Sequence, residues 1–208
     1  MARRGTMSHS VAHSNFVTNE QEGSPIKKND EDIVSLGTFD VISSELVVSD
    51  PGYKSGSWGT GRLKNVRPGY WNAGISMANL GDWGDRIVML SIWHENAPEK
   101  DKLNRYKADF VVGVDSGQAG FFDAAHYRDS SVIDTAPART WSDSESVWYD
   151  RCCEITLSSM QAGILPFGTV SASGFGDGCY SCFYYTNSAG EILRAEIVFI
   201  TEDELEDY

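Results

Sequence analysis

The sequence predicts an all-β or β-dominated protein, built as an antiparallel sandwich or partly open barrel with one or two short helices. From residue 33 onward, apolar residues recur with the short period of strands, and β-branched and aromatic residues lie between Gly, Pro, Asn and Asp. Helical periodicity is thin and is confined to residues 97–107 and 142–147. Strands at this spacing with few helices between them favour antiparallel sheets over a parallel α/β arrangement.

Each expected strand is a short apolar run bounded by turn residues. The runs are 33–41, 45–49, 71–77, 86–93, 110–114, 119–123, 147–157, 169–172, 179–186 and 192–200. The clearest local element is a hairpin, because the turn residues Asn187 to Gly190 separate two alternating runs. In its second strand, alternation predicts that one set of side chains faces the core: Leu193, Ala195, Ile197 and Phe199.

The length of 208 residues fits one domain, and the 41% hydrophobic and 12% aromatic content supports a packed core. Residues 1–30 are polar with few apolar positions, so we expect a disordered leader. Residues 31–201 form the single β-rich domain. Residues 202–208 are rich in carboxylates and are expected to be a solvated acidic tail.

The formal net charge of −13 disfavours nucleic acid and anionic membranes as partners, since both are normally bound by Lys and Arg patches. No stretch of apolar residues is long enough to span a bilayer. The basic N-terminus is not followed by the apolar core of a secretory signal. We therefore expect a cytoplasmic protein.

Three Asp/Gly-dense turns mark the candidate site: residues 50–53, 113–123 and 174–180. Glycines allow tight turns and also close approach of the backbone to a ligand, so each turn has a structural and a functional interpretation. Turn aspartates usually bond their own backbone, which favours the structural interpretation for Asp50. In the functional interpretation, carboxylate, amide and phenol groups contact a ligand, and the residues are Asp50, Tyr53, Asp115, Gln118, Asp123, Asp177 and Tyr180.

Other chemistries have weaker support. The four cysteines occur as Cys152-Cys153 and Cys179-x-x-Cys182, and their expected place on strands points them to different faces, which disfavours a zinc site. A divalent cation held by oxygen ligands stays open, although no calcium loop or phosphate-binding loop is present. His126 is the histidine nearest to the candidate site. Trp58, Trp83 and Trp141 lie in loops, where a Trp can be a stacking platform.

The three turns, in this order, resemble a bacterial family, the domain of unknown function numbered 4241. The matching segments are Val48 to Tyr53, Gly113 to Asp123 and Ser173 to Tyr180, with a weaker match at Pro68-Gly69-Tyr70. The resemblance covers residues 34–200 and leaves out the cysteine pairs, the leader and the loop from 129 to 147. It implies no established activity, cofactor or partner, and supports only the choice of site.

Three functions remain open, and the sequence does not decide whether the protein is an enzyme. The leading hypothesis is a small-ligand-binding module whose turns converge on one cleft. The second is a hydrolase in which two carboxylates act as acid and base or hold a metal ion that activates water. The third is a protein-interaction factor, such as an immunity or anti-defence protein, whose acidic surface covers a basic partner. The oligomeric state is not predicted.

Overall fold

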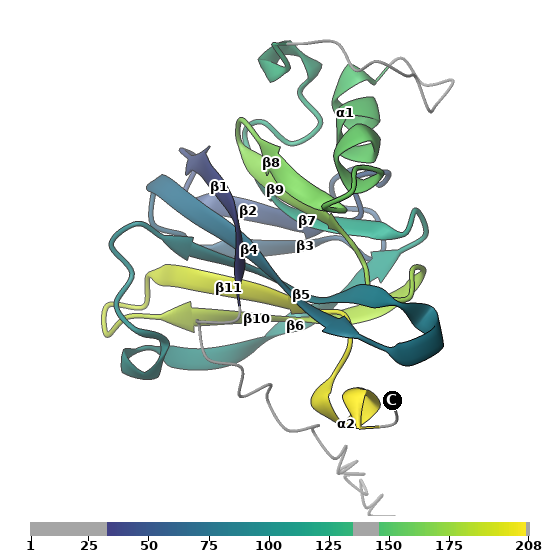
Figure 1. Cartoon of the computed structure of the whole chain (residues 1–208). Coiled ribbons are helices and arrows are strands. Elements are labelled where there is room, and N and C mark those ends of the chain that lie inside the picture. The colour runs from purple at the N-terminus through teal and green to yellow at the C-terminus, as the bar shows by residue number, and fades with distance from the viewer. Residues whose placement is uncertain (1–32, 135–145, 207–208) are drawn as a thin grey trace, which may run out of the picture.

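The computed structural model describes residues 33–134 and 146–206, and within these ranges the chain forms eleven strands and two α-helices (Figure 1). The strands in chain order are β1 Val34–Val41, β2 Glu45–Ser49, β3 Gly61–Lys64, β4 Gly69–Asn79, β5 Asp85–His94, β6 Asn104–Val114, β7 Gln118–Asp123, β8 Ala162–Leu165, β9 Gly168–Ala172, β10 Gly178–Thr186 and β11 Ile192–Val198. The helices are α1 Val147–Thr156 and α2 Glu202–Leu205.

The strands form two antiparallel sheets that face each other as an open sandwich, which confirms the predicted fold class. The six-stranded sheet has the order β1-β4-β5-β11-β10-β6, and the five-stranded sheet has the order β3-β2-β7-β9-β8. On one side the edge strands β1 and β8 contact each other, and the Asp40 N–H donates to the Pro166 carbonyl. On the other side the edge strands are β3 and β6.

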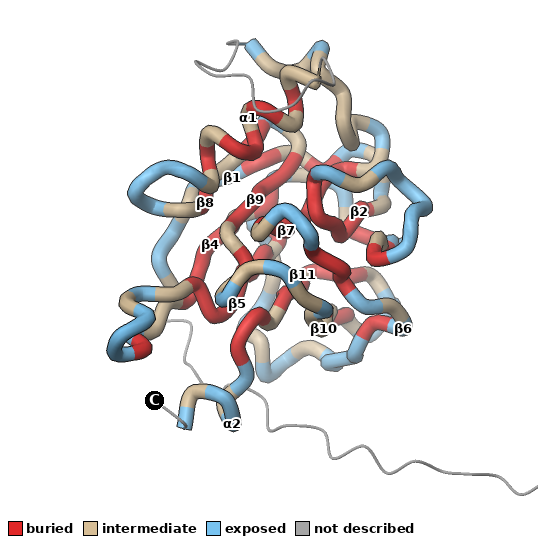
Figure 2. Tube along the Cα trace, turned by 90° about the vertical axis from the view of Figure 1, so that its right-hand side faces the viewer, coloured by how far each residue is buried: buried red, intermediate tan, exposed pale blue. Residues whose placement is uncertain are grey.

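The main core lies between the two sheets. Figure 2 shows that buried residues of the chain lie mostly along the strands and exposed residues mostly in the loops. The largest fully buried side chains include Trp71, Phe121, Leu90 and Ile197. The predicted hairpin is confirmed, because β10 and β11 pair from Ser181–Val198 to Thr186–Ile192. Its predicted core-facing set, Leu193, Ala195, Ile197 and Phe199, is buried.

The largest error of the sequence analysis concerns residues 147–157, which form helix α1 and not a strand. Ser146 caps the helix, since its hydroxyl accepts the Tyr149 N–H. Trp148, Cys152 and Ile155 face the five-stranded sheet, where they form a second apolar cluster with Phe122, Leu165 and Val170. Figure 1 shows α1 against β8 and β9. The helix therefore covers the outer face of this sheet.

The remaining differences from the predicted fold are smaller. The expected helix at 97–107 is a single 3-10 turn at Lys100–Lys102 followed by β6. The short strands β3 and β8 were not predicted. Residues 202–205, placed in the acidic tail, form the one-turn helix α2, whose capping box joins Thr201 and Glu204. The leader 1–30 and Trp141 lie outside the described residues, and no described helix has the length and apolarity to cross a membrane.

Candidate functional site

The first two turns are joined by the Asp50 carboxylate, which is buried at 1% exposure. One of its oxygens accepts the Gly52 N–H at 2.7 Å and the Ser116 hydroxyl at 2.7 Å. The other accepts the Asp115 N–H at 2.9 Å and the Ser116 N–H at 2.8 Å. Asp50 therefore bonds its own turn, as turn aspartates usually do, and also reaches a turn 65 residues further along the chain.

The third turn is joined to the second by the backbone, because the Ser173 N–H donates to the Gly117 carbonyl at 3.1 Å. Tyr180 holds the inside of the third turn, since its hydroxyl lies 3.0 Å from the Ser173 carbonyl and 2.6 Å from the Gly176 carbonyl. The residues 50–53, 115–117 and 173–177 thus meet at one end of the sandwich, which we call the turn end. The structure therefore brings parts of all three turns together, while the role of these residues in binding a ligand stays a prediction.

Three of the predicted residues present polar groups to solvent at the turn end. Asp115 and Asp177 are exposed and Tyr53 is half-buried. The Tyr53 hydroxyl donates to the Asp115 carboxylate, and this hydrogen bond, with the charges of Asp115, Asp50 and Asp177 nearby, raises the pKa of Tyr53 to about 12. Tyr53, Asp115 and Asp177 are therefore the part of the turn end that a ligand could contact.

Two residues that the sequence analysis missed, Tyr127 and Arg128, donate hydrogen bonds to backbone carbonyls of the first turn. The Tyr127 hydroxyl donates to the Tyr53 carbonyl at 2.7 Å and lies 3.2 Å from the Ser49 hydroxyl. The Arg128 guanidinium donates to the Pro51 carbonyl. Burial raises the pKa of Tyr127 to about 12. The Tyr127 hydroxyl is therefore protonated at neutral pH and can donate to the Tyr53 carbonyl. Neither residue lies in a motif that a single sequence would single out.

Asp123 and Gln118 do not join the exposed group. Asp123 ends β7, about 17 Å along the strand from Gln118 at the usual rise per residue. Its buried carboxylate accepts four hydrogen bonds, from the Ile42, Ser43 and Ala125 N–H groups and the Ser43 hydroxyl, and fixes the β1–β2 turn. Gln118 is buried beneath α1, where its amide contacts the Cys153 sulfur and the Thr156 hydroxyl.

The cysteines are not arranged as a metal centre. Cys152 and Cys153 lie on α1, so the expectation that they alternate along a strand was wrong, while Cys179 and Cys182 lie on β10. All four are free thiols. Among residues 33–134 and 146–206, no three or more His, Cys, Asp or Glu side chains lie together as metal ligands.

His126 stacks on Phe167 and pairs with Asp129, whose pKa is lowered to about 2 by hydrogen bonds from Ser131 and His126.

A groove of about 550 Å³ lies along the open side of the sandwich, between the edge strands β3 and β6. The β3 wall contributes Arg62, Leu63 and Lys64. The β6 wall contributes Tyr106, Ala108, Asp109 and Phe110. The remaining lining comes from β10, β11 and the loop between them: Tyr184, Thr186, Gly190 and Ile192. None of the seven predicted site residues lines this groove.

Both ends of the groove are closed by contacts between the sheets. At one end the Gly113 N–H donates to the Gly59 carbonyl at 3.0 Å, and a side chain on either glycine would collide with the other. At the other end the Ile192 N–H donates to the Asn65 carbonyl at 2.9 Å, and the Arg67 N–H donates to the Ile192 carbonyl at 3.1 Å. The groove is therefore a bounded depression.

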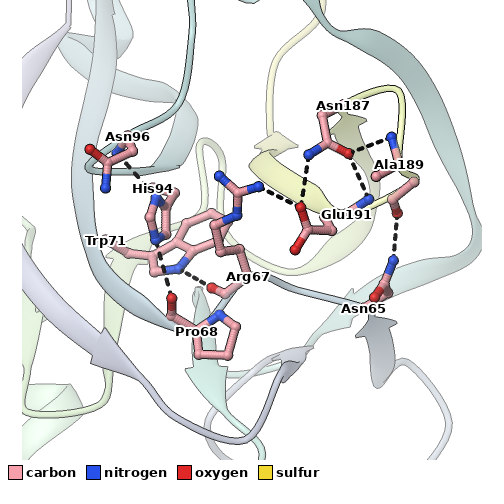
Figure 3. A network of polar contacts seen from close by, with 10 residues as sticks. Asn65, Arg67, Pro68, Trp71, His94, Asn96, Asn187, Ala189 and Glu191 are labelled. Carbon is pink, nitrogen blue, oxygen red and sulfur yellow. Dashed lines mark hydrogen bonds and ion pairs between the residues drawn. The ribbon is translucent and has the colours of Figure 1, made fainter.

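A polar network supports the second closed end (Figure 3). Asn65 donates to the Gly190 carbonyl at 2.8 Å, and Glu191 pairs with Arg67 and accepts from Asn187, which lowers the pKa of Glu191. Behind Arg67, buried His94 accepts the Asn96 N–H, so its other ring nitrogen carries the proton and donates to the Pro68 carbonyl at 3.2 Å. This network keeps the β10–β11 loop beside residue 65.

The Pro68-Gly69-Tyr70 motif has a structural explanation in the same network. Gly69 has a φ of +133°, and a Cβ atom there would lie 2.8 Å from the His94 ring nitrogen. Only glycine allows this backbone conformation and this close approach together. The motif is therefore part of the frame of the groove, and it contributes no lining residue.

The groove combines aromatic surface with charge. The rings of Tyr106 and Tyr184 are stacked with their centroids 5.5 Å apart and their planes 22° from parallel. Arg62 is paired with Glu45 at 2.7 Å and donates to the Ser55 hydroxyl. For the Lys64 ammonium group no bonded partner is found in the described part of the chain. Polar and apolar surface contribute to its lining in about equal shares. Small-molecule sites likewise combine apolar surface with placed polar groups.

These features define an antiparallel β-sandwich with a bounded groove at its open edge and three fused turns at one end. A family model described as protein of unknown function (DUF4241) matches residues 39–197. The chain therefore belongs to this family, and the resemblance drawn from the three turns is confirmed. Searches of curated proteins and of solved structures each found no match.

Proposed function

We propose that the protein binds a small molecule and that the ligand occupies the groove between β3 and β6. The observation that carries the proposal is the groove itself, whose volume of about 550 Å³ lies within the range of small-molecule sites. Its lining joins three buried apolar residues, Leu63, Ala108 and Ile192, to exposed polar groups. This is the leading hypothesis of the sequence analysis with its site moved from the turns to the neighbouring edge.

The turn end supports this function by holding the groove. Asp50 fixes residues 115 and 116, which directly follow β6, the longer wall. Trp58 packs on Gly113, and Tyr53 lies beside Gly59. The Gly59–Gly113 contact that closes one end of the groove is therefore packed against side chains from the first turn and the loop after it. The carboxylates of Asp50 and Asp123 each accept four internal hydrogen bonds, which compete with proton transfer or metal binding at these oxygens. We therefore assign these two carboxylates a scaffolding role.

Ligand-observed NMR with a fragment library tests the proposal, followed by mapping of each hit on the backbone amide spectrum. We expect hits to shift the amides of residues 62–64 and 106–110 more than those of residues 51–53 and 115–117. Tyr106→Ala removes one stacking surface and is expected to weaken binding about two- to tenfold. Hits that shift only the turn amides, or a library without any hit, would contradict the proposal.

Tyr70→Ala provides the matched control, because Tyr70 is a strand tyrosine of similar exposure, 56% against 47% for Tyr106, and does not line the groove. It is expected to leave the affinity of every hit unchanged. An equal loss in both variants would show that the hits bind exposed tyrosines nonspecifically.

A further inference from the structure

We infer that the ligand is a flat aromatic ring carrying an anionic group, with the ring on the Tyr106–Tyr184 pair and the anion beside Lys64. This inference rests on the proposed function and names the chemical class that the groove would accept.

The ring position follows from the pairing of β6 with β10. Tyr106 and Tyr184 are direct partners in the register of the two strands, and their near-parallel rings stack on each other, so a ligand ring would stack on an outer face of this pair. Tyr106 keeps 47% of its surface exposed, so this aromatic surface is accessible from the groove that it lines. Aromatic surfaces of this kind favour another planar ring in offset stacking.

The anion position follows from the direction of the two walls. Gly59 lies against Gly113 and Gly61 against Phe110, so β3 and β6 run in opposite directions along the groove. Lys64 is therefore nearest to the Tyr106 end, whereas Arg62 and Asp109 lie toward the Phe110 end. Arg62 is already paired with Glu45, which leaves Lys64 as the cation that can meet a ligand.

The two cations of the β3 wall stand out against the negative net charge of the chain. With a formal net charge of −13, the protein as a whole repels anions, whereas the β3 wall contributes two cations, Arg62 and Lys64, to the lining of the groove. An anion bound here would lie beside Lys64, which stands opposite Glu45 in the β2–β3 register, and the Glu45 carboxylate is paired with Arg62. Because Asp109 lies toward the Phe110 end, charge complementarity at the Tyr106 end favours an acid over a neutral or basic ligand.

The closed ends favour a small ligand over an extended peptide. A peptide that adds a strand to an edge needs a free run along that edge. Here the Gly59–Gly113 contact and the pairing of residues 65–67 with Ile192 bound the groove at both ends. Occupation by a peptide strand is accordingly an outcome that would overturn the inference.

Three probes with the same ten-carbon, two-ring skeleton separate the contribution of the flat ring from that of the charge: 2-naphthoate, 2-naphthamide and decahydronaphthalene-2-carboxylate. Their dissociation constants are measured by amide-shift titration on the full chain, in the wild type, Lys64→Gln and Tyr106→Leu. We expect naphthoate to bind tightest and Lys64→Gln to weaken it about fivefold, to the level of the amide, as for a partly exposed ion pair. The same substitution should leave the amide unchanged.

Tyr106→Leu should weaken naphthoate and naphthamide alike and leave the saturated acid unchanged, because only the flat rings stack. Lys54→Gln, an exposed lysine outside the groove, is the charge control and should change none of the constants. Circular dichroism and the amide spectrum verify that each variant keeps the wild-type fold.

The two proposals fail in different ways. If acid and amide bind the groove equally and Lys64→Gln changes neither, the inferred class is wrong and small-ligand binding in the groove stands. If the saturated acid binds as tightly as naphthoate, the ring position is wrong. If none of the probes and no library fragment shifts the groove amides, while a peptide of acidic and aromatic residues does, both the class and the proposed function are wrong.

Discussion

The turn end and the groove lie next to each other on the sandwich, and they use polar residues in opposite ways. At the turn end the carboxylate of Asp50 is buried and every bond it makes is internal. In the groove Lys64 and Asp109 are exposed, and the stacked tyrosines keep accessible surface. The difference teaches that a dense Asp/Gly motif can build the frame of a site while residues outside the motif line it.

The largest expected effect tests the frame. Asp50→Asn removes the charge and turns one acceptor into a donor that faces N–H or O–H groups, so we expect the free energy of unfolding to fall by roughly 3 kcal/mol. Urea denaturation measures it. Asp109→Asn is the matched change in the groove and should stay within about 0.5 kcal/mol of the wild type. Equal losses in the two variants would erase the contrast between the regions.

The second effect tests whether Gly61 of β3 is packed tightly against Phe110 of β6. A Cβ atom on Gly61 would lie 2.0 Å from the Phe110 ring, so Gly61→Ala must displace a lining residue of the groove. We expect a loss of about 1 to 3 kcal/mol in the free energy of unfolding. The double variant Gly61→Ala/Phe110→Leu should recover part of this loss, because the smaller side chain leaves room. A simply additive double variant would place the strain elsewhere.

The third effect concerns the exposed pair at the turn end. The hydrogen bond to Asp115 holds the pKa of Tyr53 at about 12, above the value of 10 for an unperturbed tyrosine. Because the folded-state pKa is the higher one, the protonated phenol stabilises the fold below pH 10, and this contribution is lost as the pH rises from 10 to 12. In NMR of ring-labelled tyrosine, Asp115→Asn should return the Tyr53 pKa toward 10. An unchanged titration would show that the pair does not form in solution.

The smallest effect is expected at Asp177. Its carboxylate is exposed and contributes to the turn end through charge near Tyr53, so Asp177→Asn should change the free energy of unfolding by less than about 0.5 kcal/mol. Thermal denaturation at two salt concentrations measures this change. A loss comparable to that of Asp50→Asn would mean that Asp177 also belongs to the frame.

Much of the fold was predictable because strand alternation is a local signal. The error at α1 is instructive, since the helical signal was present: Trp148, Cys152 and Ile155 recur at the helical spacing, and Ser146 stands at the cap. Val, Trp, Tyr, Cys, Ile and Thr also favour strands, and this propensity hid the period. Short β3 and β8 escaped prediction because four residues carry too little pattern.

The candidate site was only half predictable. The tendency of Asp50 to bond its own turn is local chemistry, whereas its reach to residues 115 and 116 depends on the packing of two sheets. The groove takes its lining from residues 62–64, 106–110 and 184–192, which no spacing rule connects. Its tyrosines are ordinary strand residues in the sequence, and only the register of β6 against β10 makes them a stacked pair.

The exposure of Cys179 gives the molecule a practical handle. Cys152, Cys153 and Cys182 are buried, and burial raises the pKa of Cys152 and Cys182, so alkylating reagents at neutral pH meet one accessible thiol. Cys179 stands opposite Gly113, where the turn end and the groove meet. A single environment-sensitive dye attached there would report on both regions at once, in the native sequence and without a single substitution.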